Sequence, residues 1–155
     1  MPPNPKTALL AAIVAQLEEE LAQFTAGAET SRQEATDAEN RQEGKYDMRA
    51  QLAAYLAAGQ AKLAAELHEA LTAYRHLSVA DLPPGSAVTV GALVSIETNR
   101  KPSWFFLGPA RGGLEIPIGD DTVTIITPTS PLGRQILGRK AGEPLPPSRR
   151  LLSVM

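Results

Sequence analysis

In the first half of the chain, apolar side chains recur every three or four positions, the spacing that places them on one face of an α-helix. A first series comprises Leu10, Ile13, Leu17, Leu21 and Phe24. A second series follows a polar interval at residues 36–48 and comprises Leu52, Tyr55 or Leu56, Leu63, Leu67, Leu71 and Tyr74. Each series is narrow and flanked by alanine, which suits close contact between two helices.

Proline positions support two uninterrupted helices. After Pro5 no proline occurs until Pro83, and an interior proline would remove a helical hydrogen bond and clash with the preceding turn. Gly44, in the polar interval, permits a reversal of the chain. We therefore expect two antiparallel helices of about 35 residues, each about 50 Å long, that turn near residues 38–44. One continuous helix is the alternative, but it would leave its narrow apolar face in water.

The second half of the chain has the pattern of short strands. Glycine, proline or asparagine separates four β-prone segments, which are residues 87–96, 104–107, 114–118 and 123–126. A short helix is expected at 134–140, with Ser130 as N-cap and Pro131 at the first helical position, and a last strand at 149–155. The predicted fold class is α+β: a long antiparallel helical hairpin, residues 1–78, followed by a small β-sheet domain with a short helix, residues 79–155.

Composition excludes several classes of site. The chain has no cysteine, which rules out disulfides, thiol catalysis and thiolate metal sites. His68 and His76 have no carboxylate-rich setting that suggests a metal site, and we interpret them as surface residues. No apolar run approaches the roughly 20 residues of a membrane span, and no secretory cleavage pattern follows the start. We therefore expect a soluble, cytoplasmic, monomeric protein.

Charge is distributed unevenly. Residues 1–77 contain 11 acidic and 7 basic residues, a formal charge of −4, and residues 78–155 contain 6 and 8, a formal charge of +2. Neither half has the dense basic stripe that is typical of a direct nucleic-acid binder. A weak basic face in the second half is expected from Arg100, Lys101, Arg111, Arg134, Arg139 and Lys140.

Two segments of the chain carry motifs of a known family. The segment Ser130-Pro131-Leu132-Gly133-Arg134, continued by Leu137-Gly138-Arg139-Lys140 and Gly142-Glu143, is similar to the C-terminal signature of the GreA/GreB transcription elongation factors, which occurs in an FKBP-like domain. The segment Glu43-Gly44-Lys45-Tyr46, continued by Arg49, Leu52, Tyr55 and Gly59-Gln60, resembles the entry into the second helix of the family's coiled coil. The likeness covers roughly residues 8–145, and the C-terminal motif is the more specific part.

The resemblance implies an accessory factor rather than an enzyme. Such factors insert the hairpin into the secondary channel of the core RNA polymerase of bacteria, where acidic tip residues help to hold a catalytic Mg²⁺ and a water that cleave backtracked RNA. The globular domain docks at the channel rim, and the partner-binding residues expected there are Ser130, Pro131, Leu132 and Gly133. The protein would have no cofactor of its own, would share Mg²⁺ with the polymerase and would meet nascent RNA only indirectly.

The tip departs from the family pattern of Asp and Glu three residues apart. Glu43 matches the glutamate and is the expected Mg²⁺ ligand in the polymerase complex, whereas Asn40 stands in place of the aspartate. An amide is a poorer Mg²⁺ ligand than a carboxylate. Asp37, Glu39 and Asp47 lie near enough to compensate if the turn is shifted, and Arg41 is expected to contact the polymerase. Stimulation of RNA cleavage and occupation of the channel without cleavage therefore both stay open.

Two other classes of function were weighed against this one. A prolyl isomerase or FKBP-like chaperone needs an aromatic-lined apolar pocket, but Trp104, Phe105 and Phe106 are consecutive and must alternate between the faces of a strand. A coiled-coil adaptor would explain the helices, but it would leave the Ser-Pro-Leu-Gly motif unexplained.

Overall fold

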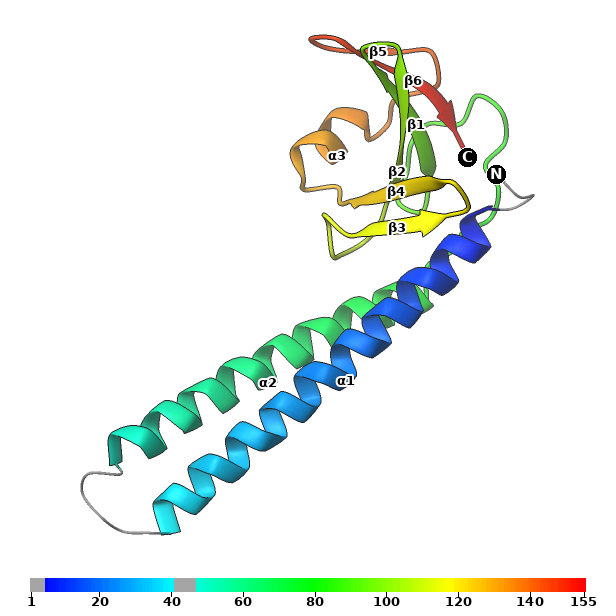
Figure 1. Cartoon of the computed structure of the whole chain (residues 1–155). Coiled ribbons are helices and arrows are strands. Elements are labelled where there is room, and N and C mark those ends of the chain that lie inside the picture. The colour runs from blue at the N-terminus through cyan, green and yellow to red at the C-terminus, as the bar shows by residue number, and fades with distance from the viewer. Residues whose placement is uncertain (1–4, 41–46) are drawn as a thin grey trace. The chain divides into compact units, whose positions relative to one another are not determined.

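The computed structural model of the chain describes residues 5–40 and 47–155 (Figure 1). The fold is α+β, with two long helices, one short helix and one six-stranded mixed sheet. The chain divides into two compact units: Ala15–Thr72 forms one, and the start of the chain up to Val14 joins Ala73–Met155 in the other. The domain boundary expected between residues 78 and 79 stays a prediction.

Helices α1 and α2 occupy the first half of the chain, as predicted. Helix α1 spans Pro5–Asn40 and helix α2 spans Asp47–Arg75, which gives lengths of about 54 and 43 Å at 1.5 Å per residue. Proline is tolerated at the first turn of a helix because its missing N–H has no partner there. Within Ala15–Thr72 the two helices run side by side in opposite directions (Figure 1). The expected reversal near residues 38–44 lies largely outside the described residues.

The predicted face of α1 is confirmed in part, and Leu9, which was not predicted, is also fully buried. Ile13 and Leu17 are fully buried, whereas Leu10, Leu21 and Phe24 are half-buried.

The buried face of α2 differs in part from the predicted one. Leu67 and Leu71 are buried as expected, but the buried positions nearer the start of the helix are Ala50 and Ala53. Four large apolar residues that were expected on the buried face are exposed instead: Leu52 (59%), Tyr55 (76%), Leu56 (50%) and Leu63 (44%). The prediction was wrong because it ranked positions by side-chain size, whereas alanines at this spacing let two helices approach closely.

The second unit is built on one sheet. Its strands are β1 (Leu93–Thr98), β2 (Lys101–Leu107), β3 (Glu115–Ile118), β4 (Asp121–Ile126), β5 (Pro144–Leu145) and β6 (Arg149–Val154). The order across the sheet is β3-β4-β2-β1-β6-β5, and only β2 and β4 pair in parallel.

The strand predictions are confirmed with three corrections, the first being that β2 begins at Lys101 rather than at residue 104. The strand expected from residue 87 begins only at Leu93, because Gly91, at φ +96°, turns the chain there. The two-residue strand β5 was not predicted, since its sequence is too short for an alternating pattern.

Apolar side chains cover both faces of the sheet. One face carries the core made by Val94, Ile96, Leu107 and Ile126 together with Ile136 of the short helix α3 (Pro131–Ile136). Because neighbouring strand residues point to opposite faces, Phe106 and Ile125, both fully buried, belong to the other face. Phe105 packs on the first core and Phe106 does not, so the three consecutive aromatic residues do not line one pocket, as expected.

Two long polar side chains fix the helix ends within the sheet unit. Lys6, in the first turn of α1, is 1% exposed, and its Nζ donates to the carbonyl oxygens of Ala80 at 2.8 Å and Met155 at 2.9 Å. Burial lowers the pKa of Lys6, and the charge of Asp81 opposes this effect. These contacts join residues 6, 80 and 155, so the start of α1 is part of the sheet unit.

Tyr74, near the end of α2, is fully buried and donates from its hydroxyl to the carbonyl oxygen of Ala110 at 2.5 Å. Gly108 makes room for this hydroxyl, because a Cβ at that position would lie 2.1 Å from Oη. Burial raises the pKa of Tyr74 to about 12, although the charge of Arg111 acts in the opposite direction. The neutral phenol is therefore the form that the folded protein holds.

We expect this phenol to make stability fall at alkaline pH. Above pH 10 an unfolded tyrosine loses its proton while Tyr74 keeps it, so folding stability should decrease by about 1 kcal/mol per pH unit between about pH 10 and 12. Tyr74→Phe should cost about 1 kcal/mol at pH 8 through the lost hydrogen bond. The stability difference between the two proteins, measured by urea unfolding, should then vanish near pH 11. A difference that is constant across this range would contradict the expectation.

Candidate functional site

The acidic residues of the predicted tip lie at the ends of the two long helices. Asp37 and Glu39 belong to the last turn of α1, Asn40 is its final residue, and α2 begins at Asp47. Arg41 and Glu43 lie outside the described residues, so their predicted roles, like those of Asp37 and Glu39, stay predictions.

The position of Asp37 and Glu39 contradicts the usual charge preference of a helix. The C-terminal end of a helix carries a partial negative charge and favours cations, and an acid there costs about 0.3–1 kcal/mol. The last turn of α1 nevertheless contains no basic residue. Residues that violate a local preference are frequent at functional sites. The end of α1 is therefore a candidate site, because two acidic residues stand at a helix end that disfavours them.

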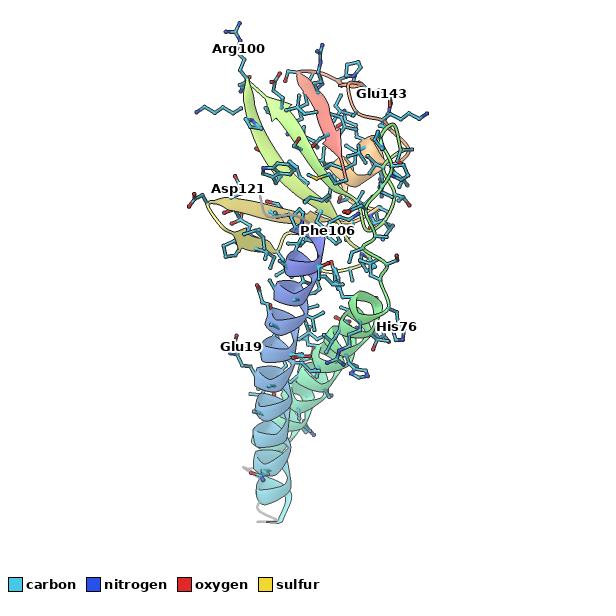
Figure 2. All side chains as sticks on the ribbon, turned by 90° about the vertical axis from the view of Figure 1, so that its right-hand side faces the viewer. Glu19, His76, Arg100, Phe106, Asp121 and Glu143 are labelled. Atoms are coloured by element: carbon cyan, nitrogen blue, oxygen red, sulfur yellow. The ribbon has the colours of Figure 1, made fainter. Side chains whose placement is uncertain are left out.

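The unit that contains these ends is strongly acidic. Residues 15–72 hold eleven acidic and five basic residues, a formal charge of −6. Glu19 is one of the exposed acids of this unit (Figure 2). An acidic surface of this kind favours association with basic surfaces and disfavours direct contact with the phosphates of nucleic acids.

The Ser-Pro-Leu-Gly motif forms the start of α3. Ser130 is the N-cap: its Oγ accepts from the backbone N–H of Gly133 at 3.1 Å and donates to the carbonyl oxygen of Thr127 at 2.7 Å. Pro131 occupies the first turn, where no N–H is needed. The cap was predicted correctly, but the helix expected at 134–140 spans Pro131–Ile136, because Gly138 at φ +81° turns the chain beyond its end.

Two of the four partner-binding residues predicted in this motif, Ser130 and Gly133, hold the turn together and do not offer their side chains to a partner. Gly133 is buried, and a Cβ there would lie 1.8 Å from the carbonyl oxygen of Thr127, while Ser130 is committed to the cap. Leu132 is half-buried and packs on the core. Pro131 is the exposed member of the motif. The partner contacts themselves stay a prediction.

The surface beside Pro131 contains Arg134, which was expected in a weak basic face, and Leu137, which the sequence did not single out for a partner. Arg134 is exposed on α3, and Leu137, the C-cap, is 47% exposed although it is a large apolar residue. Pro131, Arg134 and Leu137 together form what we call the α3 surface. An apolar residue followed by Gly138 was the available signal for Leu137, since a glycine that ends a helix leaves its cap residue near solvent.

The described residues contain neither a candidate metal site nor a candidate membrane-spanning helix. Within residues 5–40 and 47–155, no group of three or more His, Asp or Glu side chains is arranged to hold a metal. His68 and His76 are both exposed, as expected. No helix in this described part of the chain is long and apolar enough to cross a membrane.

Comparison with known proteins gives distant structural likenesses. No protein-family model matches this chain, and no curated protein matches its sequence. Among solved structures, the transcription factor Gfh1 aligns with 92% of this chain and 93% of its own, at 17% identity and a TM-score of 0.39. Gfh1, or GreA factor homolog 1, of Thermus thermophilus aligns with 92% of this chain and 94% of its own, at 14% identity and a TM-score of 0.37.

Gfh1 of Thermus aquaticus aligns with 90% of this chain and 92% of its own, at 14% identity and a TM-score of 0.34. Scores and identities in this range do not establish a family.

Proposed function

We propose that this chain is a Gre-like transcription factor that binds bacterial core RNA polymerase and places its helical unit in the secondary channel. The observation that carries the proposal is the Ser130-Pro131-Leu132-Gly133 motif. It was singled out for its resemblance to the Gre signature, and it forms a capped, tightly packed helix start next to an exposed surface. In this proposal the protein is an accessory factor without a cofactor of its own.

The helical unit suits the role of a channel-entering element. We propose that α1 and α2 pack as an antiparallel coiled-coil hairpin, with the alanine-rich face of α2 allowing close approach of the helices. Helices of about 43–54 Å give such a hairpin the reach to place its tip far from its base. The charge of −6 on residues 15–72 would favour entry into a channel lined by basic residues.

The sheet unit would supply the docking contact. We propose that it is the FKBP-like domain of the family and that the α3 surface meets the channel rim. Exposed proline and leucine offer apolar surface whose burial against a partner is favourable, and arginine is enriched in interfaces. Ser130 and Gly133 would act by holding this surface in shape.

A second candidate function is occupation of the channel without cleavage. Asn40 stands where the family pattern has an aspartate, and it is the last residue of α1. An amide oxygen is a weaker Mg²⁺ ligand than a carboxylate, so the Asn40–Glu43 pair would hold the metal less firmly than Asp and Glu. A factor with this tip would compete for the channel and inhibit rather than stimulate cleavage.

Binding to polymerase tests both versions of the proposal. The protein should bind core RNA polymerase of its own organism at low salt, compete with an authentic Gre factor, and lose affinity as salt rises, because screening weakens charge complementarity. Leu137→Glu should reduce the affinity about tenfold or more, since a buried interface leucine would be replaced by a charge. Affinity would be measured by fluorescence anisotropy of labelled protein.

The matched control for this substitution is Leu152→Glu. Leu152 is 39% exposed and also belongs to the sheet unit, on β6 rather than at α3. Equal loss of affinity in both variants would remove the α3 surface from the proposal. No detectable binding of the unaltered protein at low salt would overturn the proposed function.

A further inference from the structure

Four basic residues that are far apart in the sequence meet at one end of the sheet. Arg100 and Lys101 lie at the β1–β2 turn, and Arg149 and Arg150 begin β6. The strand register joins them: Thr98 pairs with Lys101 on one side and with Arg149 on the other. Arg100, Lys101, Arg149 and Arg150 are called the basic end below.

The basic end presents charge in several directions. Directly paired residues point to the same face of a sheet, so Lys101 and Arg149 flank Thr98 on one face, with their Cα atoms about 10 Å apart across two strand spacings. Arg150 is on the opposite face, paired with Glu97. Arg100 projects from the turn, away from the sheet (Figure 2).

The charge of the basic end is largely uncompensated. All four side chains are exposed. Within residues 5–40 and 47–155, none of them takes part in a hydrogen bond or ion pair, and with Glu97 included the local formal charge is +3. Glu143 directly precedes β5, the strand that pairs with Arg149 and Arg150, and its carboxylate accepts from the backbone N–H of Lys140. The carboxylates of Glu115, Asp120 and Asp121 belong to β3, β4 and the turn between them.

The backbone at Arg100 is unusual for its residue type. Asn99 and Arg100 have φ values of +52° and +64°, and together they form a two-residue turn between the paired residues Thr98 and Lys101. Turns of this type favour Asn-Gly, because both central residues need a positive φ. Asparagine is in its expected place, whereas arginine stands where glycine would be unstrained. Strain at an exposed position points to a use for the side chain.

We propose that the basic end binds the phosphate backbone of double-stranded DNA without reading its bases. Guanidinium groups bind phosphate oxygens in bidentate fashion, and three of the four residues are arginines. Phosphates recur along the duplex at one charge per about 1.7 Å, so cations that point in several directions find partners in any register.

Single-stranded nucleic acid fits this surface less well. Proteins that bind single strands combine a basic groove with several aromatic side chains on which bases stack. On the strands of the basic end the aromatic residue nearest to it is Trp104, which is half-buried. An acidic protein surface would need carboxylates at matching positions, whereas the duplex supplies anions everywhere. The proposal goes beyond polymerase binding and does not depend on it.

Anisotropy of a fluorescein-labelled DNA duplex of mixed sequence, titrated with the full-length protein, tests the proposal. Affinity should fall with salt between about 25 and 200 mM, with a slope of log K against log salt of about −3 for three to four phosphate contacts. The double variant Arg149→Gln/Arg150→Gln should weaken binding at low salt at least tenfold and reduce the slope by about 2.

Arg100→Gly separates loss of charge from loss of structure. It should reduce the salt slope by about 1 and at the same time raise the melting temperature by a few degrees, because glycine adopts the turn without strain. Lys62→Gln, an exposed lysine on α2 far along the sequence, removes one charge as well and should leave the slope unchanged.

Three results would overturn the proposal. The first is absence of duplex binding at about 25 mM salt, and the second is an unchanged slope in the Arg149/Arg150 variant. The third is tighter binding of a labelled polyglutamate peptide than of the duplex at the same salt, which would assign the basic end to an acidic protein. Because polymerase is absent from the assay, each of these results leaves the proposed function standing.

Discussion

Replacing Gly133 by alanine should lower the free energy of unfolding of the sheet unit by about 3 kcal/mol or more, the upper end of the usual cost of overpacking a core. The new Cβ would lie 1.8 Å from the carbonyl oxygen of Thr127 and 2.8 Å from Oγ of Ser130. Neither neighbour can move alone, because Ser130 binds both Thr127 and Gly133. The start of α3 must therefore detach from the preceding turn, and with it the packing of Ile136 in the core.

Urea unfolding followed by the fluorescence of Trp104 measures this effect, since Trp104 is the single tryptophan of the chain and belongs to β2. Ser130→Ala, which removes only the cap, should cost about 1 kcal/mol. Gly59→Ala is the matched control: a Cβ at this exposed position in α2 meets nothing within 4 Å, and alanine should stabilise the helix by up to about 1 kcal/mol. A small loss for Gly133→Ala, similar to that of Ser130→Ala, would show that the turn is plastic.

Gly133 and Gly59 illustrate which features of the fold could be predicted from the sequence and which could not. Two long helices followed from the proline positions and from helix-forming residues, because both effects are local. The strands followed from alternation and from the glycines and prolines between them. Strand register and close contacts between segments are not local properties. The sequence around Gly133 does not indicate that the carbonyl oxygen of Thr127 occupies the space where a side chain at position 133 would lie.

The error in α2 has the same origin. A hydrophobic pattern identifies which face of a helix is apolar, and α2 has two candidates, one with leucine and tyrosine and one with alanine. The choice between them depends on the distance to the neighbouring helix, which the sequence of α2 does not contain. In the structure Ala50 and Ala53 are buried and Leu52 and Leu56 are exposed, so the alanine face is the buried one.

The basic end was missed for a related reason. Arg100 and Lys101 were noted as part of a weak basic face, but Arg149 and Arg150 were not, because they begin the last predicted strand and the sequence does not say which strand it pairs with. The pairing of β1 with both β2 and β6 brings them together. Pairing between distant strands is the property that sequence patterns specify least.

In a complex with stalled, backtracked polymerase, Glu43→Ala should lower any RNA cleavage that the factor stimulates by about a hundredfold. Under the proposed function Glu43 would supply a carboxylate near the catalytic Mg²⁺, and removal of one such group costs several kcal/mol of transition-state stabilisation. Asp37→Ala and Glu39→Ala should have smaller effects, since only Glu43 is in register with the family's glutamate. Asn40→Asp should raise the rate, because it restores two carboxylates three residues apart.

The comparison needs saturating factor, so that a change in chemistry is not mistaken for a change in affinity. Polymerase affinity should be the same for Glu43→Ala and the unaltered protein, since a tip acid adds little to the docking area. Full cleavage by Glu43→Ala would show that the tip register is wrong and that Asp37, Glu39 or Asp47 holds this position. Binding without cleavage, even in Asn40→Asp, would favour the second candidate function. The amide at position 40 would then be one of several changes that let the factor occupy the channel without supplying a ligand to the Mg²⁺.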